Sequence, residues 1–146
     1  SAPLTQSVEV TGVITADLWI SSSALDTDFT VKIVDLAPPN SDYPNGYALN
    51  IVDSVLRVRY RNSWEHEELL EPGKIYPIHI KLAPTSNLFK AGHRIRVDIS
   101  SSNFPRLDIN PNTGEAIGKH THMVVAENTL HCNQSYPSAI NLPVIN

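Results

Sequence analysis

Short segments in which apolar and polar residues alternate, separated by prolines and turn residues, constrain the fold of this chain most strongly. In "HRIRVDIS", Ile95, Val97 and Ile99 share one side of an extended segment, and the other side carries charged residues. The 146 residues include 11 prolines and 6 glycines, and no segment sustains the period of a helix. Alternation with a period of two is typical of half-buried β-strands. The sequence therefore predicts an all-β protein.

The same alternation predicts which residues form the core. Gly12 interrupts the first such segment, "SVEVTGVITADLWIS", and is expected to mark a bend or bulge. The segments "HMVVAENTLH" and "SAINLPVI" are expected to form the last strands. Roughly seven or eight antiparallel strands in this length favour a two-sheet sandwich of the jelly-roll type. The apolar sets expected to face inward are Ile14, Ala16, Leu18 and Ile20; Phe29, Val31 and Ile33; Leu56, Val58 and Tyr60; Tyr76, Ile78, Ile80 and Leu82; and Ile95, Val97 and Ile99.

Length and charge limit the organisation and the classes of partner. No linker or repeat divides the chain, so residues 1–146 are predicted to form a single β-sandwich domain. The net charge of −4, with acids and bases scattered evenly, argues against a nucleic-acid surface. No apolar run approaches the ~20 residues of a membrane span, so no membrane partner is expected. Cys132 is the single cysteine and forms no intrachain bridge, which leaves the compartment undetermined, and a homo-oligomer stays open.

Motifs for catalysis or metal binding are incomplete in this sequence. No GxSxG elbow is present to activate a serine, and Asp26 and Asp28 are interpreted as a strand-entry feature rather than an acid and base pair. His120 and His122 offer only two metal ligands. The run "DINPNTG" begins like a calcium loop but has Thr113 where glycine is required. We therefore predict no catalytic residue, no metal site and no cofactor in this chain.

Three arginines, Arg57, Arg59 and Arg61, alternate in "RVRYR" and are predicted to share one face of a strand. Guanidinium groups arranged in this way suit the binding of a carboxylate-bearing partner. The alternative is a solvated strand face whose arginines pair with the acids of "EHEELLE". The sequence slightly favours this second interpretation.

A series of longer motifs resembles a known family. These motifs are, in order, "DTDFTVKIVDLAPP", "SVLRVRYRNSWE", "LEPGKIYPIHIKLAPTSNLFKAGHRIRVDISSSNFPRLDINPNTG" and "SAINLPVI". They resemble the C-terminal domain of the family that contains X-prolyl dipeptidyl peptidases, cocaine esterase and cephalosporin acylases. The resemblance spans nearly the whole chain and is most specific over residues 89–114.

The resemblance implies a galactose-binding-like jelly roll that packs against an α/β-hydrolase domain of the same polypeptide and helps to wall its substrate pocket. It places the catalytic serine, aspartate and histidine upstream in that hydrolase domain, so this chain is expected to be a non-catalytic accessory domain. A carbohydrate-binding module is the alternative, because jelly rolls include lectins. The loop 101–114 is expected to be ordered, with Asp108 paired to Arg106 or Arg96. Its residues expected to face the hydrolase domain or its pocket are Asn103, Phe104, Arg106, Asp108 and Asn110.

Overall fold

Antiparallel β-strands make up the regular structure of the chain, which confirms the predicted all-β class. A computed structural model describes residues 1–145. Within this part the chain also forms one short 3₁₀ helix, η1. The elements are β1 (Val8–Gly12), β2 (Thr15–Ser22), β3 (Asp28–Ala37), β4 (Tyr47–Arg57), η1 (Val58–Tyr60), β5 (Tyr76–Lys81), β6 (Thr85–Phe89), β7 (Arg94–Ser100), β8 (Asn128–Asn133), β9 (Tyr136–Pro137), β10 (Ala139–Asn141) and β11 (Val144–Ile145).

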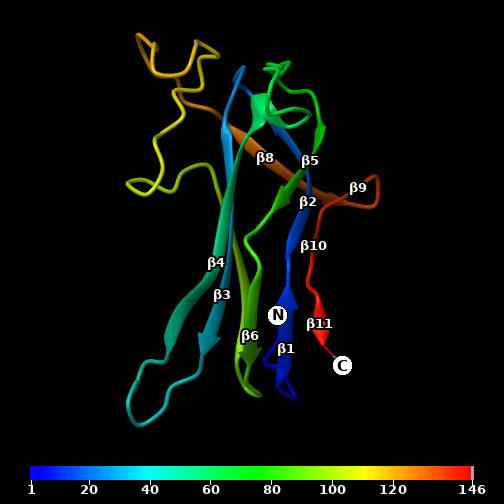
Figure 1. Cartoon of the computed structure of the whole chain (residues 1–146), viewed down its shortest axis with the longest axis vertical. Coiled ribbons are helices and arrows are strands. Elements are labelled where there is room, and N and C mark those ends of the chain that lie inside the picture. The colour runs from blue at the N-terminus through cyan, green and yellow to red at the C-terminus, as the bar shows by residue number, and fades with distance from the viewer. Residues whose placement is uncertain (146) are drawn as a thin grey trace.

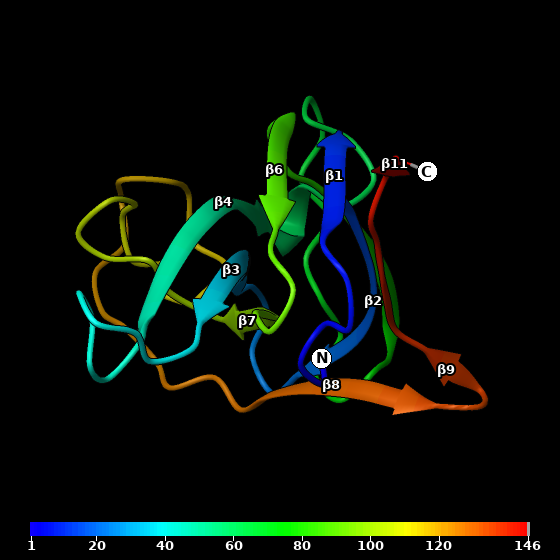
Figure 2. The ribbon, with the colours of Figure 1, turned by 90° about the horizontal axis from the view of Figure 1, so that it is seen from below.

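The strands form two layers, as the predicted sandwich requires (Figure 1). One layer is the sheet β4-β3-β7, whose central strand β3 pairs with both neighbours. The other layer contains two sheets placed end to end. In the first, β2 pairs with β5 on one side and with β10 and β8 on the other. The second has the order β11-β1-β6. Figure 2 shows β3 and β4 on one side and β1 and β2 on the other.

Gly12 lies at the break between the two sheets of the second layer, as predicted for a bend. Its φ of 136° is one that residues with a side chain rarely adopt, and a Cβ there would lie 3.2 Å from Cγ of Pro143. Backbone hydrogen bonds continue across the break, because the amide of Leu82 donates to the carbonyl of Ile14 over 3.0 Å. The two sheets therefore cover the core together.

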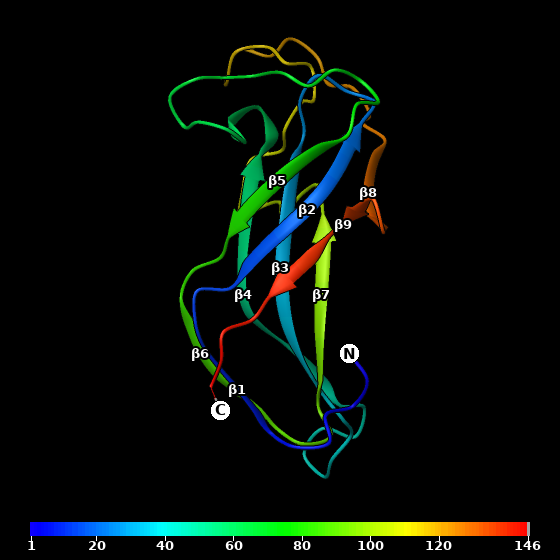
Figure 3. The same ribbon diagram turned by 90° about the vertical axis from the view of Figure 1, so that its right-hand side faces the viewer.

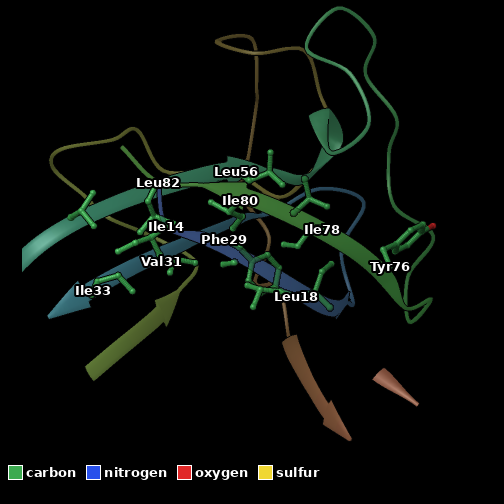
Figure 4. Close-up of a cluster of buried hydrophobic side chains, with 14 of the residues drawn as sticks. Ile14, Leu18, Phe29, Val31, Ile33, Leu56, Tyr76, Ile78, Ile80 and Leu82 are labelled. Carbon is green, nitrogen blue, oxygen red and sulfur yellow. The ribbon is translucent and has the colours of Figure 1, made fainter. Parts of the chain in front are cut away.

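The core lies between the layers and contains almost all of the predicted inward residues (Figure 4). Ala16, Leu18 and Ile20 of β2 are at most 2% exposed, and Ile14, in the turn before β2, is fully buried. Phe29 and Ile33 of β3 belong to the same apolar cluster as Ile78 and Ile80 of β5. Burial of this alternating face fixes the register, because a shift by one residue would expose it.

Three sequence predictions need correction. Ile95, Val97 and Ile99 pack on the core but stay half-buried, on a strand that pairs only with β3 among the described residues. The strand predicted through "RVRYR" ends at Arg57, and the chain then turns into η1. The strand predicted from His122 begins only at Asn128, and Val125 before it is 91% exposed.

Candidate functional site

Several motifs that are far apart in the sequence meet at one end of the sandwich. The segment before β3, the end of β4 with η1, the following loop 61–75 and the long loop 101–127 all lie at this end (Figures 1 and 3). They include the quoted motifs "DTDF", "RVRYR" and "DINPNTG". We call this part of the molecule the loop end.

Asp28 and Arg57 form the first ion pair of the loop end. They are direct neighbours across the β3–β4 ladder, so the sheet register places them together. The guanidinium donates from Nε to Oδ1 over 2.9 Å and from Nη2 to Oδ2 over 3.0 Å, which is a bidentate geometry. The hydrogen bond from Asp28 raises the pKa of Arg57 above its ordinary value, although partial burial opposes the shift. Arg57 therefore stays charged and fixed in orientation.

Arg59 and Asp26 form a second pair in the protein interior. Their side chains are only 2% and 0% exposed, and Nε of Arg59 donates to Oδ2 of Asp26 over 2.7 Å. The backbone amide of Arg59 donates to the other carboxylate oxygen over 3.0 Å. Nη1 donates to the carbonyl of Glu115 and to the carboxylate of Glu67. Arg59 thus joins the loops 61–75 and 101–127 to the start of β3.

Asn110 connects the two ion pairs. Its side-chain amide donates to Oδ2 of Asp26 over 2.9 Å and to Oδ1 of Asp28 over 2.7 Å. The side-chain carbonyl accepts from the amide of Asn112 over 2.9 Å, so the predicted turn cap is present. Asn112 in turn donates to the carbonyl of Val124 over 2.9 Å. This buried network, Asp26, Asp28, Arg57, Arg59 and Asn110, anchors the long loop to the sandwich.

An open cavity of about 470 Å³ lies beside the buried network. Arg57, Arg59 and Asn110 contribute to its lining, which also includes charged side chains of Asp108 and Glu115. Hydrogen bonds from two threonines lower the pKa of Glu115, so this carboxylate is held as an anion. The apolar residues that line the cavity and are strongly exposed are Phe104 (65%), Ile117 (55%), Met123 (55%) and Ile109 (48%). We call these four the apolar rim.

The predicted site residues occupy different places in this arrangement. Phe104 and Asp108 line the cavity and are exposed, whereas Asn110 is 3% exposed and belongs to the buried network. Asn103 and Arg106 do not line the cavity, because both bind Asp53 on β4. Asp108 forms none of the ion pairs within residues 1–145.

The expected partners of Asp108 are occupied elsewhere. Arg106 pairs with Asp53, and Arg96 pairs with Asp98 at 3.0 Å. The sequence pattern missed Asp53 as a partner because it lies on a different strand, beyond the reach of local spacing. Arg106 is therefore held by a residue of β4 rather than by one within the loop.

The arrangement of Arg57, Arg59 and Arg61 also differs from the prediction. Arg61 and Arg59 do bind acids of "EHEELLE", since Nη2 of Arg61 lies 2.6 Å from Oε1 of Glu68. However, the three side chains do not form one solvated face, because η1 turns Arg59 into the interior. The presence of Asp26 and Asp28 at the entry of β3 was the available signal, because buried arginines need nearby carboxylates.

Residues 1–145 hold no group of three or more His, Cys, Asp or Glu side chains placed to bind a metal ion. His120 lines the cavity, whereas His122 lies 3.7 Å from Glu115. No helix in the part of the chain that the structure describes is long and apolar enough to cross a membrane.

Gly114 fixes the path of the long loop and provides a test of it. Its φ is 76°, and a Cβ would lie 3.1 Å from Leu69 and 3.3 Å from Leu25. We expect Gly114→Ala to lower the free energy of unfolding by about 1–3 kcal/mol, through backbone strain and crowding. Gly118→Ala is the control, because φ is 73° there and the space is open, so only the strain remains. Equal midpoints of urea unfolding for the two variants would show that Gly114 is not tightly packed.

By its fold the chain belongs to the class of antiparallel β-sandwiches, with a polar network and an apolar rim at one end. The model of one family, described as the X-Pro dipeptidyl-peptidase C-terminal non-catalytic domain, matches residues 1–141. The chain belongs to this family.

Similar proteins are hydrolases of greater length. Cocaine esterase of Rhodococcus sp. (strain MB1 Bresler) is 46% identical over 144 residues, which cover 97% of this chain and 24% of the esterase. A putative serine esterase of Mycobacterium bovis is 28% identical over 99% of this chain and 23% of its own length. The chain therefore spans about a quarter of the relatives that it matches.

Two solved structures share the fold closely. An aminopeptidase from a marine sediment archaeon, Thaumarchaeota archaeon, superimposes with a TM-score of 0.93 at 32% identity, over all of this chain and 25% of the aminopeptidase. An α-amino acid ester hydrolase superimposes with a TM-score of 0.92 at 30% identity, over 98% of this chain and 24% of the hydrolase.

Proposed function

We propose that this chain is the C-terminal accessory domain of a larger serine hydrolase that acts on ester or amide bonds, including X-prolyl peptide bonds. The loop end docks on the α/β-hydrolase domain of the same polypeptide, and the residues around the cavity help to shape the substrate pocket. The relatives support this assignment, because they are esterases, a peptidase and an ester hydrolase of about four times the length of this chain.

The apolar rim is the observation that best supports the proposed docking surface. Four large apolar side chains are about half exposed or more around one cavity, on a loop that the buried network holds in place. Interfaces between domains of one chain bury roughly 600–1,500 Å² and are partly apolar. Exposed apolar patches on a soluble domain mark such contacts. Phe104, with Asp108 beside it, is the predicted site residue best placed to reach the partner domain.

The docking surface is tested in the parent hydrolase with Ile117→Asp. A carboxylate at the interface lacks a partner, so we expect a lower melting temperature of the parent enzyme and a higher KM for p-nitrophenyl acetate. The same substitution in the 146-residue chain is expected to change its stability by less than about 0.5 kcal/mol, because the side chain is exposed there.

Leu88→Asp is the matched control in both proteins. Leu88 is 52% exposed, close to the 55% of Ile117, but it lies on β6 rather than at the loop end. An equal loss of stability for the two variants in the parent enzyme would contradict docking through the loop end.

The accessory role also predicts that the isolated chain has no hydrolase activity of its own. Acyl transfer needs an activated nucleophile and a positioned base, and the family description assigns neither to this domain. We expect the purified chain to turn over p-nitrophenyl acetate no faster than an inert protein of the same histidine content. Saturable hydrolysis above that control would assign a catalytic role to the chain.

A further inference from the structure

The free edge of β7 carries unused backbone hydrogen-bonding groups. β7 pairs with β3 on one side, and no strand within residues 1–145 pairs with its other side. The carbonyl and amide of Ile95 point to this free side, because both bind Ser1: the amino group of Ser1 donates to the carbonyl over 2.8 Å, and the Ile95 amide donates to the Ser1 hydroxyl over 3.0 Å. Alternate residues of a strand point their amides and carbonyls to the same side, so those of Val97 and Ile99 also point outward.

The side chains of the same residues are incompletely covered. Ile95, Val97 and Ile99 point to the core but remain half-buried. An edge strand with free amides and β-branched apolar residues promotes pairing with other chains, and natural proteins cover or block such edges. The edge of β7 is thus suited to one more strand.

The first residues of the chain already lie along this edge. The amide of Leu4 donates to the carbonyl of His93 over 2.8 Å, and Ser1 binds Ile95 further along β7. The segment 1–4 therefore runs antiparallel to β7, and Figure 3 shows the N-terminus beside this strand. A segment that precedes Ser1 in a longer polypeptide and keeps the direction of residues 1–4 passes beside Val97 and Ile99.

We propose that the segment immediately preceding Ser1 in the parent hydrolase adds to β7 as a fourth, antiparallel strand of the β4-β3-β7 sheet. This inference rests on the proposed function, in which the chain continues a longer polypeptide. With Ser1 opposite Ile95, the second and fourth residues before Ser1 pair with Val97 and Ile99. Their side chains point to the core side, so both residues are apolar, and they complete the burial of Val97 and Ile99.

Amide hydrogen exchange tests the added strand without the catalytic domain. The 146-residue chain is compared with the same chain extended by the ~10 residues that the gene encodes before Ser1. We expect the amides of Val97 and Ile99 to exchange about tenfold or more slowly in the extended chain. The amides of Arg96 and Asp98 are internal controls, because they point to β3 and are protected in both chains.

Proline substitutions in the extension test the register. Proline at the second position before Ser1 removes an amide that points to Val97, so the protection is expected to be lost. Proline at the third position is the matched control, because the amide there points away from β7. Unchanged exchange of Val97 and Ile99 on extension would overturn the proposal.

A second occupant of the edge gives a different result. If two copies of the chain pair through β7, protection of Val97 and Ile99 rises with protein concentration and does not depend on the extension, which would also overturn the proposal. The docking of the loop end is judged separately, because Ile117→Asp acts only in the presence of the hydrolase domain.

Discussion

Arg59→Met is expected to lower the free energy of unfolding of this chain by about 3–5 kcal/mol. The guanidinium is 2% exposed and binds Asp26, whose carboxylate is 0% exposed. Methionine has a similar length but no donors, so it leaves Asp26 as a buried charge that retains the amides of Arg59 and Asn110 but no cation. The midpoint of urea unfolding measures the loss, since an unchanged slope indicates that the unfolded state is unaffected.

Two further variants distinguish the cost of leaving a buried carboxylate unpaired from the general cost of removing a cation. Lys74→Met removes an exposed ion pair with Glu71 and is expected to cost less than about 1 kcal/mol. Replacing both members of the buried pair, with Asp26→Leu added to Arg59→Met, is expected to recover part of the stability, because no buried charge then remains without its partner. A loss for Arg59→Met as small as that for Lys74→Met would show that Asp26 is not held as a buried ion.

The alternation of apolar residues predicted burial best in β2, β3 and β5. The predicted inward residues of these strands are buried, although β5 pairs only with β2 within residues 1–145. In β7 the alternation is equally regular, but the same pattern gives half-buried residues. Periodicity reports which face points inward, while burial depends on neighbours that the local sequence does not identify.

The candidate site was predicted only in part because its organisation depends on long-range pairs. Of the residues predicted from loop 101–114, Phe104 and Asp108 line the cavity. Asn110 instead bridges Asp26 and Asp28, which are more than 80 positions away in the sequence. Such contacts depend on the pairing of the start of β3 with the end of β4, which local sequence patterns do not reveal.

The 3₁₀ helix shows how one local deviation reorganises a site. Continued as a strand, "RVRYR" would place Arg59 on the same face as Arg57. The turn at residues 58–60 instead directs it inward, and its backbone amide bonds to Asp26. A buried carboxylate that accepts both a backbone amide and a guanidinium thus stabilises a turn that the residue pattern alone did not predict.

Phe29→Ala is expected to destabilise the isolated chain by about 3–5 kcal/mol, because the ring is 3% exposed and its removal leaves a cavity between the layers. Phe29 lies in the central strand β3 opposite Leu56, next to the Asp28–Arg57 pair, so the cavity also loosens the base of the loop end. Phe104→Ala is the matched control, since the same side chain is 65% exposed and its loss is expected to cost less than about 0.5 kcal/mol. Urea unfolding of both variants gives the comparison, and similar midpoints would contradict the assignment of the core. In the parent hydrolase we expect a smaller difference in stability between the two variants. Docking of the loop end buries Phe104 there, so Phe104→Ala also loses an interface contact.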